Sequence, residues 1–135
     1  LNAFEDVPVE LVLTKLKHFA SQTPQALALQ GEEVQLSYQA LDTLIEQCAV
    51  ALVNRGIKQG DFVALSLHRS WQQVVTLLAV MRAGAAYCPI DPVWPEQRKA
   101  QILTAAAPQL VISNHIHKDN VNIILIIKRL LAVNY

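Results

Sequence analysis

A helix end, a strand and a turn follow one another in the stretch Met81-Arg82-Ala83-Gly84-Ala85-Ala86-Tyr87-Cys88-Pro89-Ile90-Asp91-Pro92. Gly84 suits the left-handed residue that closes a helix, because glycine has no Cβ to clash in that conformation. Residues 86–90 are a short, mostly apolar run, which indicates a strand. Pro89 and Pro92 shape the turn, and the Asp91 side chain is placed to cap or brace it. The stretch therefore predicts a helix–strand unit of an α/β protein.

Two apolar segments precede this stretch. Residues 62–67 form a near-continuous apolar run, as expected for a strand that is covered on both faces. Residues 71–83 are apolar on nearly every side of a helix, and such a helix is buried on most sides. Ser70 and Gln73 have the spacing of a capping box, in which Ser70 caps the backbone and Gln73 reaches back to it. We expect a larger body to cover this helix.

One more helix and one more strand come after the stretch. Pro95 and Glu96 suit the first turn of a helix, and Pro108 ends it. The side chains that line its inner face are Ile102, Leu103 and Ala106. Residues 110–113 form the next strand. The order strand, helix, strand, helix, strand over residues 62–113 predicts right-handed crossovers and a parallel sheet.

The first half of the chain supplies elements that flank this sheet. The expected elements are a helix over residues 7–21, a β-hairpin of residues 26–30 and 34–37, and a second helix over residues 38–55. Ser37 stands where the N-cap of the second helix belongs. Asp42 is expected near the positive end of that helix dipole. Gly56 suits its C-terminal end.

The composition limits the expected partners and location. The chain has 135 residues, 53% of them hydrophobic and 16% charged, and 11 basic residues balance 11 acidic ones. A net charge near zero gives no electrostatic reason to expect nucleic acid or an anionic membrane as a partner. Residues 121–127 are the longest strongly apolar stretch and are too short to span a bilayer. Cys48 and Cys88 fit neither a metal site nor a disulfide framework, and we expect a cytoplasmic protein.

Two stretches resemble the core motifs of one family. The first is Leu36-Ser37-Tyr38-Gln39-Ala40-Leu41, and the second is residues 81–92. On these motifs the chain is identified as a member of the adenylate-forming (AMP-binding) enzyme superfamily and resembles the N-terminal part of a non-ribosomal peptide synthetase adenylation domain. The resemblance covers about residues 5–114. It implies a partial N-terminal subdomain of the adenylate-forming ligase fold, of α/β class, with a short β-hairpin and parallel strands between flanking helices.

The resemblance also divides the chain and assigns its motif residues. It implies that residues 1–118 are the N-terminal portion of a truncated adenylation domain, and that residues 119–135 are a divergent tail with room for one more strand. The motif residues are expected to build scaffold. The Glu that the family has three residues after the cap is Ala40 here, which loses a hydrogen bond worth ~0.5–1 kcal/mol. The positions carried over are Leu36, Ser37, Tyr38, Leu41, Ala83, Gly84, Ala86, Tyr87, Pro89, Ile90 and Asp91.

The family chemistry is expected to lie outside this chain. The resemblance implies a ligase that joins a carboxylate to the α-phosphate of ATP with the help of Mg²⁺, and passes the acyl group to a phosphopantetheine thiol on a partner carrier domain. That reaction needs a Gly-rich phosphate loop, and the four glycines of the chain do not form one. We therefore expect no catalytic, cofactor-binding or metal-binding residue, and no activity from the chain alone. Its expected partner is the remainder of the adenylation domain.

Other hypotheses stay open on the sequence. The apolar residues 71–83 also fit a non-catalytic module that binds a partner through an exposed patch. A gene remnant and a fragment of an acyl- or aryl-CoA ligase are further alternatives. His115 and His117 alternate as on a strand, but no Cys or carboxylate is placed to complete a metal site.

Overall fold

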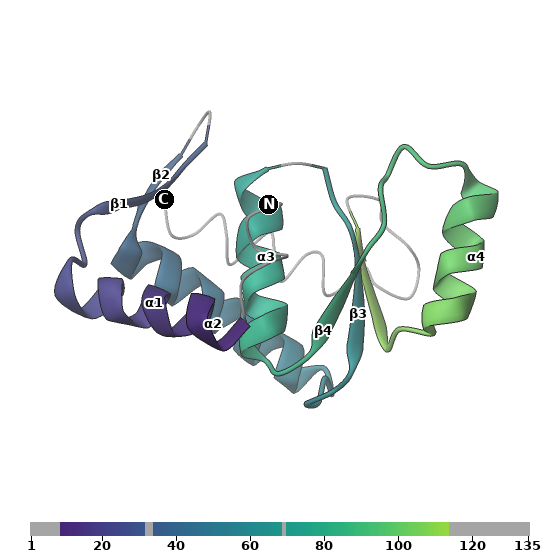
Figure 1. Ribbon diagram of the computed structural model, residues 1–135, viewed down its shortest axis with the longest axis horizontal. Helices are drawn as coiled ribbons and strands as arrows, with labels where there is room; N and C mark the ends of the chain where they lie inside the picture. Colours follow the sequence, from purple (N-terminus) through teal and green to yellow (C-terminus); the bar gives the residue numbers. More distant parts are fainter. Residues whose placement is uncertain (1–8, 32–33, 69, 114–135) are drawn as a thin grey trace.

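The computed structural model describes residues 9–31, 34–68 and 70–113. Its elements are α1 (Val9–Gln22), β1 (Leu27–Gln30), β2 (Gln35–Ser37), α2 (Tyr38–Asn54), β3 (Phe62–Ser66), α3 (Trp71–Arg82), β4 (Ala86–Pro89), α4 (Glu96–Ala106) and β5 (Leu110–Ser113). Figure 1 shows the hairpin with α1 and α2 on one side of α3, and the sheet between α3 and α4. Every helix and strand predicted within these residues is present. The strand expected at residues 121–127, and the two histidines before it, lie outside the described residues.

The larger sheet is parallel, as predicted. Its three strands have the order β4-β3-β5. The helices α3 and α4 lie on opposite sides of it in Figure 1, so the central strand is covered on both faces. Val63 and Ala64 of β3 are accordingly fully buried. The continuous apolar run of β3 is explained by this position at the centre of the sheet.

The hairpin passes directly into α2. Strands β1 and β2 are antiparallel, and their register shifts between Leu27 and Leu29. The N–H of Tyr38 then donates to the carbonyl of Ala26 at 3.0 Å. The hairpin is therefore tied to the first residue of α2, which sets where this helix begins.

The core lies mainly between α2 and α3. The buried stripe of α2 consists of Leu41, Leu44, Ile45, Cys48, Ala49 and Leu52. These are the residues that the helical spacing predicts. Burying each of the larger ones contributes ~1.5–3 kcal/mol, so this stripe is a main source of stability for the described part of the chain.

The helix α3 is buried by the chain itself. Seven consecutive residues from Val75 to Met81 are buried, and the described elements that pack most against α3 are α2, β4 and α1. The helix is thus buried on most sides, as predicted, and the described elements account for this burial; the expectation that an additional body covers it stays a prediction. It also offers no exposed apolar patch of the kind that the interaction-module hypothesis requires.

The helix α4 is packed more loosely than predicted. None of its residues is buried, and its expected inner face is only partly covered. The helix ends at Ala106 because Ala107 takes a left-handed conformation with φ of 45° and donates its N–H to the carbonyl of Leu103 at 2.9 Å. Backbone geometry at Ala107 therefore ends the helix at Ala106, two residues before Pro108.

Two predicted roles of polar residues need correction. Ser70 Oγ accepts from the N–H of Gln73 at 3.2 Å, as a cap should, but the Gln73 side chain donates to the carbonyl of Leu67 at 3.3 Å and does not complete the capping box. The acceptor that the capping box requires, Gln73 Oε1, has no hydrogen-bond partner among the described residues. Asp42 lies beyond the first turn of α2, which has no acidic residue. Its role is an ion pair with Arg82.

Candidate functional site

The carboxyl ends of the parallel strands are where a ligand would bind, because open α/β sheets place ligands in the crevice outside these ends. Strand β3 ends at Ser66 and β5 at Ser113, and these serines are partners in the register. Ser66 is 8% exposed and Ser113 3%. Neither hydroxyl is open to a solute, so this edge presents no accessible nucleophile at the two strands.

The second motif enters β4 through a tight turn at the opposite, amino ends of the strands. Gly84 follows α3 with a φ of +85°, a conformation that other residues rarely adopt. A Cβ on Gly84 would lie 3.4 Å from the Cα of Gln59. The Gly84 carbonyl accepts from the N–H of Gly60 at 2.9 Å. Gly84 therefore forms a turn that packs against the loop leading into β3.

Asp91 braces the turn after β4, as predicted. Its Oδ1 accepts from the N–H of Val93 at 3.0 Å, and its carbonyl accepts from the N–H of Trp94 at 3.1 Å. The turn leaves Val93 80% exposed. It also brings the Arg98 guanidinium to 4.5 Å from the centre of the Trp94 ring, which is a cation–π contact. The described hydrogen bonds of Asp91 thus shape the turn.

The first motif joins the hairpin to α2. Ser37 Oγ accepts from the N–H of Ala40 at 3.1 Å, so the predicted N-cap is present. The Tyr38 ring centre lies 5.1 Å from that of Phe19 in α1. The almost fully buried residues of this motif are Leu36 and Leu41. The motif therefore ties together α1, the hairpin and α2.

Arg82 of the second motif links three helices. Its Nη2 lies 2.8 Å from Asp42 Oδ1, and its Nη1 donates to the Asp42 carbonyl at 3.2 Å and lies 3.5 Å from Glu46 Oε2. Lys17 of α1 reaches Asp42 Oδ2 at 3.4 Å. The Arg82 side chain is 11% exposed, so water screens this pair only in part. The cluster holds α1, α2 and α3 together.

An apolar pocket of about 260 Å³ lies between α1, β1, α2 and α3. Its described lining is Val12, Leu16, Ala28, Leu29, Tyr38, Leu41, Val74 and Leu78. The Tyr38 hydroxyl is the one polar side-chain group among these residues. The described lining supplies no charged group that could position a carboxylate or a phosphate.

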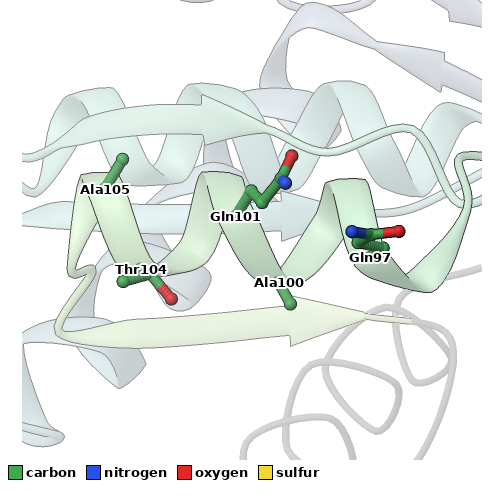
Figure 2. Close-up of a pocket in the computed structure, with 5 residues that line it drawn as sticks. All are labelled: Gln97, Ala100, Gln101, Thr104 and Ala105. Atoms are coloured by element: carbon green, nitrogen blue, oxygen red, sulfur yellow. The ribbon is translucent and has the colours of Figure 1, made fainter.

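A shallower pocket of about 490 Å³ lies against α4. Figure 2 shows its described lining residues along the helix: Gln97, Ala100, Gln101, Thr104 and Ala105. These side chains are short or uncharged, and none of them is an acid, a base or a metal ligand. The pocket therefore supplies no catalytic group from the described residues.

Few side chains in the described ranges are suited to act as a nucleophile or as a metal ligand. Burial raises the pKa of the Cys48 thiol to about 12, which keeps it protonated and unreactive. Residues 9–31, 34–68 and 70–113 contain no cluster of His, Cys, Asp or Glu that could hold a metal ion. No helix within the same ranges is long and apolar enough to cross a membrane.

The two motifs do not meet in one cleft. Tyr38 and Leu41 of the first motif line the apolar pocket, and neither pocket is lined by a described residue of the second motif. Sequence reasoning missed Arg82, whose partners lie far away in the chain. It also missed Gln109, whose Oε1 accepts from the N–H of Phe62 at 2.7 Å. The signal available in the sequence was the position of Gln109, a polar residue directly before an apolar strand.

The fold and both motifs define the class of protein, and comparison with known proteins identifies the family. The model of the family described as AMP-binding enzyme matches residues 16–133. The chain belongs to this AMP-binding enzyme family. The match crosses the boundary predicted at residue 118, and because residues 114–135 lie outside the described ranges, this division of the chain stays a prediction.

Peptide synthetases are the relatives in sequence. The chain is 38% identical over 108 residues to the probable non-canonical non-ribosomal peptide synthetase CymA of Salinispora arenicola, covering 79% of this chain and 1% of that protein. It is 35% identical over 117 residues to bacitracin synthase 1 of Bacillus licheniformis, covering 86% of this chain and 2% of that protein. The chain therefore spans only a small part of these relatives.

Solved structures place the fold within the adenylation domain. The N-terminal subdomain of Klebsiella oxytoca NpsA, in complex with 3-hydroxyanthranilyl-AMSN, matches with a TM-score of 0.70 and 27% identity, covering 75% of this chain and 26% of that one. The non-ribosomal peptide synthetase FmoA3, in its α-methyl-L-serine-AMP bound form, matches with a TM-score of 0.70 and 28% identity, covering 81% of this chain and 12% of that one. The chain thus corresponds to an N-terminal part of a peptide synthetase adenylation domain, as predicted.

Proposed function

We propose that this chain is the opening scaffold of an ATP-dependent domain that activates an amino acid for non-ribosomal peptide synthesis, and that it has no activity alone. The observation that carries the proposal is the engagement of the motif residues. Ser37 caps a helix, Gly84 forms a turn against a neighbouring loop, and Asp91 braces a turn. Each of these side chains or turns therefore has a structural role, which supports a scaffold.

The described residues do not fit the cofactors of the family. A triphosphate needs successive backbone amides in a Gly-rich loop, whereas Gly56, Gly60 and Gly84 stand singly at turns. The acidic side chains of the described ranges form no cluster for Mg²⁺. We therefore assign ATP and Mg²⁺, and the phosphopantetheine of a carrier domain, to parts of the adenylation machinery other than these residues.

The substrate class follows from the relatives. The NpsA complex holds 3-hydroxyanthranilyl-AMSN and the FmoA3 complex holds α-methyl-L-serine-AMP, so both an aryl acid and an amino acid occur among similar proteins. The peptide-synthetase relatives favour an amino acid. We also propose that residues 119–135 are a divergent tail, and that the protein works in the cytoplasm, where its two free cysteines would stay reduced.

An ATP–pyrophosphate exchange assay tests the proposal. The purified chain, supplied with Mg²⁺ and a mixture of amino and aryl acids, should give exchange at the level of a no-enzyme control. The Klebsiella oxytoca NpsA protein serves as a positive control for the assay. Exchange well above background from this chain alone, lost on heat denaturation, would show that the reacting groups are present after all.

A further inference from the structure

The apolar pocket between α1, β1, α2 and α3 has the size of a small-molecule site. Its volume is about 260 Å³, whereas well-packed protein interiors contain few voids larger than a water molecule. An engineered apolar cavity of about 150 Å³ in another protein is large enough to bind benzene. The pocket therefore has room for a molecule with roughly two fused rings.

The described lining of the pocket selects against charged ligands. Seven of its eight described residues are aliphatic, and they come from all four elements. A carboxylate or a phosphate among these side chains would lose its hydration without gaining a partner, which is strongly unfavourable. A neutral apolar molecule instead gains dispersion contacts with the aliphatic side chains. A rigid ring also loses less conformational freedom on binding than a flexible chain of the same size.

Tyr38 adds one polar group to this lining. Its ring centre lies 5.1 Å from that of Phe19, and its N–H donates to the carbonyl of Ala26 at 3.0 Å. These contacts hold the residue at the junction of the hairpin and α2. Its hydroxyl forms no hydrogen bond with another residue of the described ranges, and a phenol hydroxyl can both donate and accept. Tyr38 can therefore bind one polar atom of a ligand.

We propose that this pocket binds a small neutral molecule that has an apolar ring and a single hydrogen-bonding group. The ring contacts the aliphatic side chains, and the polar atom meets the Tyr38 hydroxyl. The inference uses only residues that the structure describes and does not depend on the proposed function. Because four elements contribute to the lining, the ligand connects α1 and the hairpin to α2 and α3 and stabilises the folded chain.

Titration of the full chain with indole tests the site. Indole is neutral, has two fused rings and carries one N–H group. In NMR spectra of the chain with ¹³C-labelled methyl groups, the methyl signals of the lining residues should shift and saturate with a Kd below about 1 mM. The methyl signals of Leu103 in α4 and Val111 in β5 are controls and should not shift. At about ten times the Kd of indole, the Tm of the chain should rise by about 5 °C.

Two related probes test the chemistry of the pocket. Indole-3-carboxylate adds a negative charge to the same ring system and should bind at least about tenfold more weakly than indole. Indene has the same fused-ring size without the N–H group and should bind about fivefold more weakly. Tyr38→Phe removes the hydroxyl and should abolish this difference between indole and indene.

A matched pair of variants tests the position of the ligand. Ala28→Leu places a larger side chain in the lining and should weaken the binding of indole at least about tenfold. Ala105→Leu makes the same exchange at an exposed position of α4 and should leave the Kd unchanged. Where Ala28→Leu does not fold, the Tyr38→Phe variant and the methyl shifts of the unmodified chain decide the matter.

Four results would overturn the site. The first is the absence of saturable shifts in the lining up to the solubility limit of indole. The second is equal shifts at Leu103 and Val111, which mean non-specific association. The third is binding of indole-3-carboxylate as tight as that of indole. The fourth is a set of contacts between the lining methyl groups and other parts of the chain that indole does not displace, which means that the chain fills the pocket itself.

Discussion

Replacing Arg82 by methionine should destabilise the fold through one defined contact. Methionine keeps the apolar stem in place and removes the guanidinium. Asp42 Oδ1, which lies 2.8 Å from Arg82 Nη2, is then left without a compensating charge at that distance. Neither of these two atoms has a hydrogen-bond partner elsewhere in the described chain, so no existing contact replaces the lost one.

The size of the loss follows from the burial of the two partners. Breaking a fully buried pair costs about 3–5 kcal/mol, and an exposed pair contributes ~0–1 kcal/mol. The Arg82 side chain is 11% exposed and that of Asp42 21%, and Lys17 still reaches Asp42 at 3.4 Å. We therefore expect a loss of about 2 kcal/mol in the free energy of unfolding, which lowers the Tm by roughly 8 °C.

Urea unfolding followed by tryptophan fluorescence measures this loss. The control is Lys17→Met, which removes a cation that is 58% exposed and should cost no more than about 0.5 kcal/mol. A double-mutant cycle with Asp42→Asn isolates the pair, and its coupling energy should be about 1–2 kcal/mol. The reasoning is refuted if Arg82→Met lowers the free energy of unfolding as little as Lys17→Met does. It is also refuted if Arg82→Met has the same effect in the Asp42→Asn variant as in the unmodified chain, because the ion pair then does not hold these helices together.

Three further predictions concern single positions. Gly84→Ala should cost about 1–2 kcal/mol in urea unfolding because of the positive φ, and an unchanged midpoint would show that the turn relaxes. Ser70→Ala should cost about 1 kcal/mol because it removes the N-cap of α3, whereas Ser70→Gly should cost less; equal losses would mean that the cap is unimportant. The folded state holds the Cys48 proton more tightly than the unfolded state, since its pKa is raised to about 12 from 9.0. Stability should therefore be full below pH 9 and fall as pH rises from 9 towards 12, and a Cys48→Ala variant should show a smaller fall over that window.

Local patterns were sufficient wherever the determinants are close together in the chain. The stripe from Leu41 to Leu52 depends on helical spacing, and the cap by Ser37 acts on a residue three positions away. Strand β5 has the predicted bounds because Pro108 and the apolar run that follows mark it locally. In these cases sequence neighbours are also spatial neighbours.

One mistaken expectation involves a partner that is distant in sequence, and the other involves a partner that lies outside the helix. Asp42 meets Arg82 across 40 positions, and the Gln73 side chain meets the end of the preceding strand. A charged residue near the start of a helix is expected to interact with the helix dipole. A specific ion-pair partner from another element can determine its role instead, and helical spacing cannot reveal that partner. The same limit applies to α3, whose apolar surface was correctly recognised while its covering elements were not.

The sequence alone was sufficient to predict the order of helices and strands, the parallel sheet and the family resemblance. These features depend on periodicity, caps and turn residues, which act over a few positions. Tertiary structure decided which described elements cover α3 and how the Arg82 cluster joins three helices. These properties depend on side chains and backbone groups that folding brings together from distant positions. Hydrogen-bond direction at β4 and β5 becomes defined only when each strand is paired with β3.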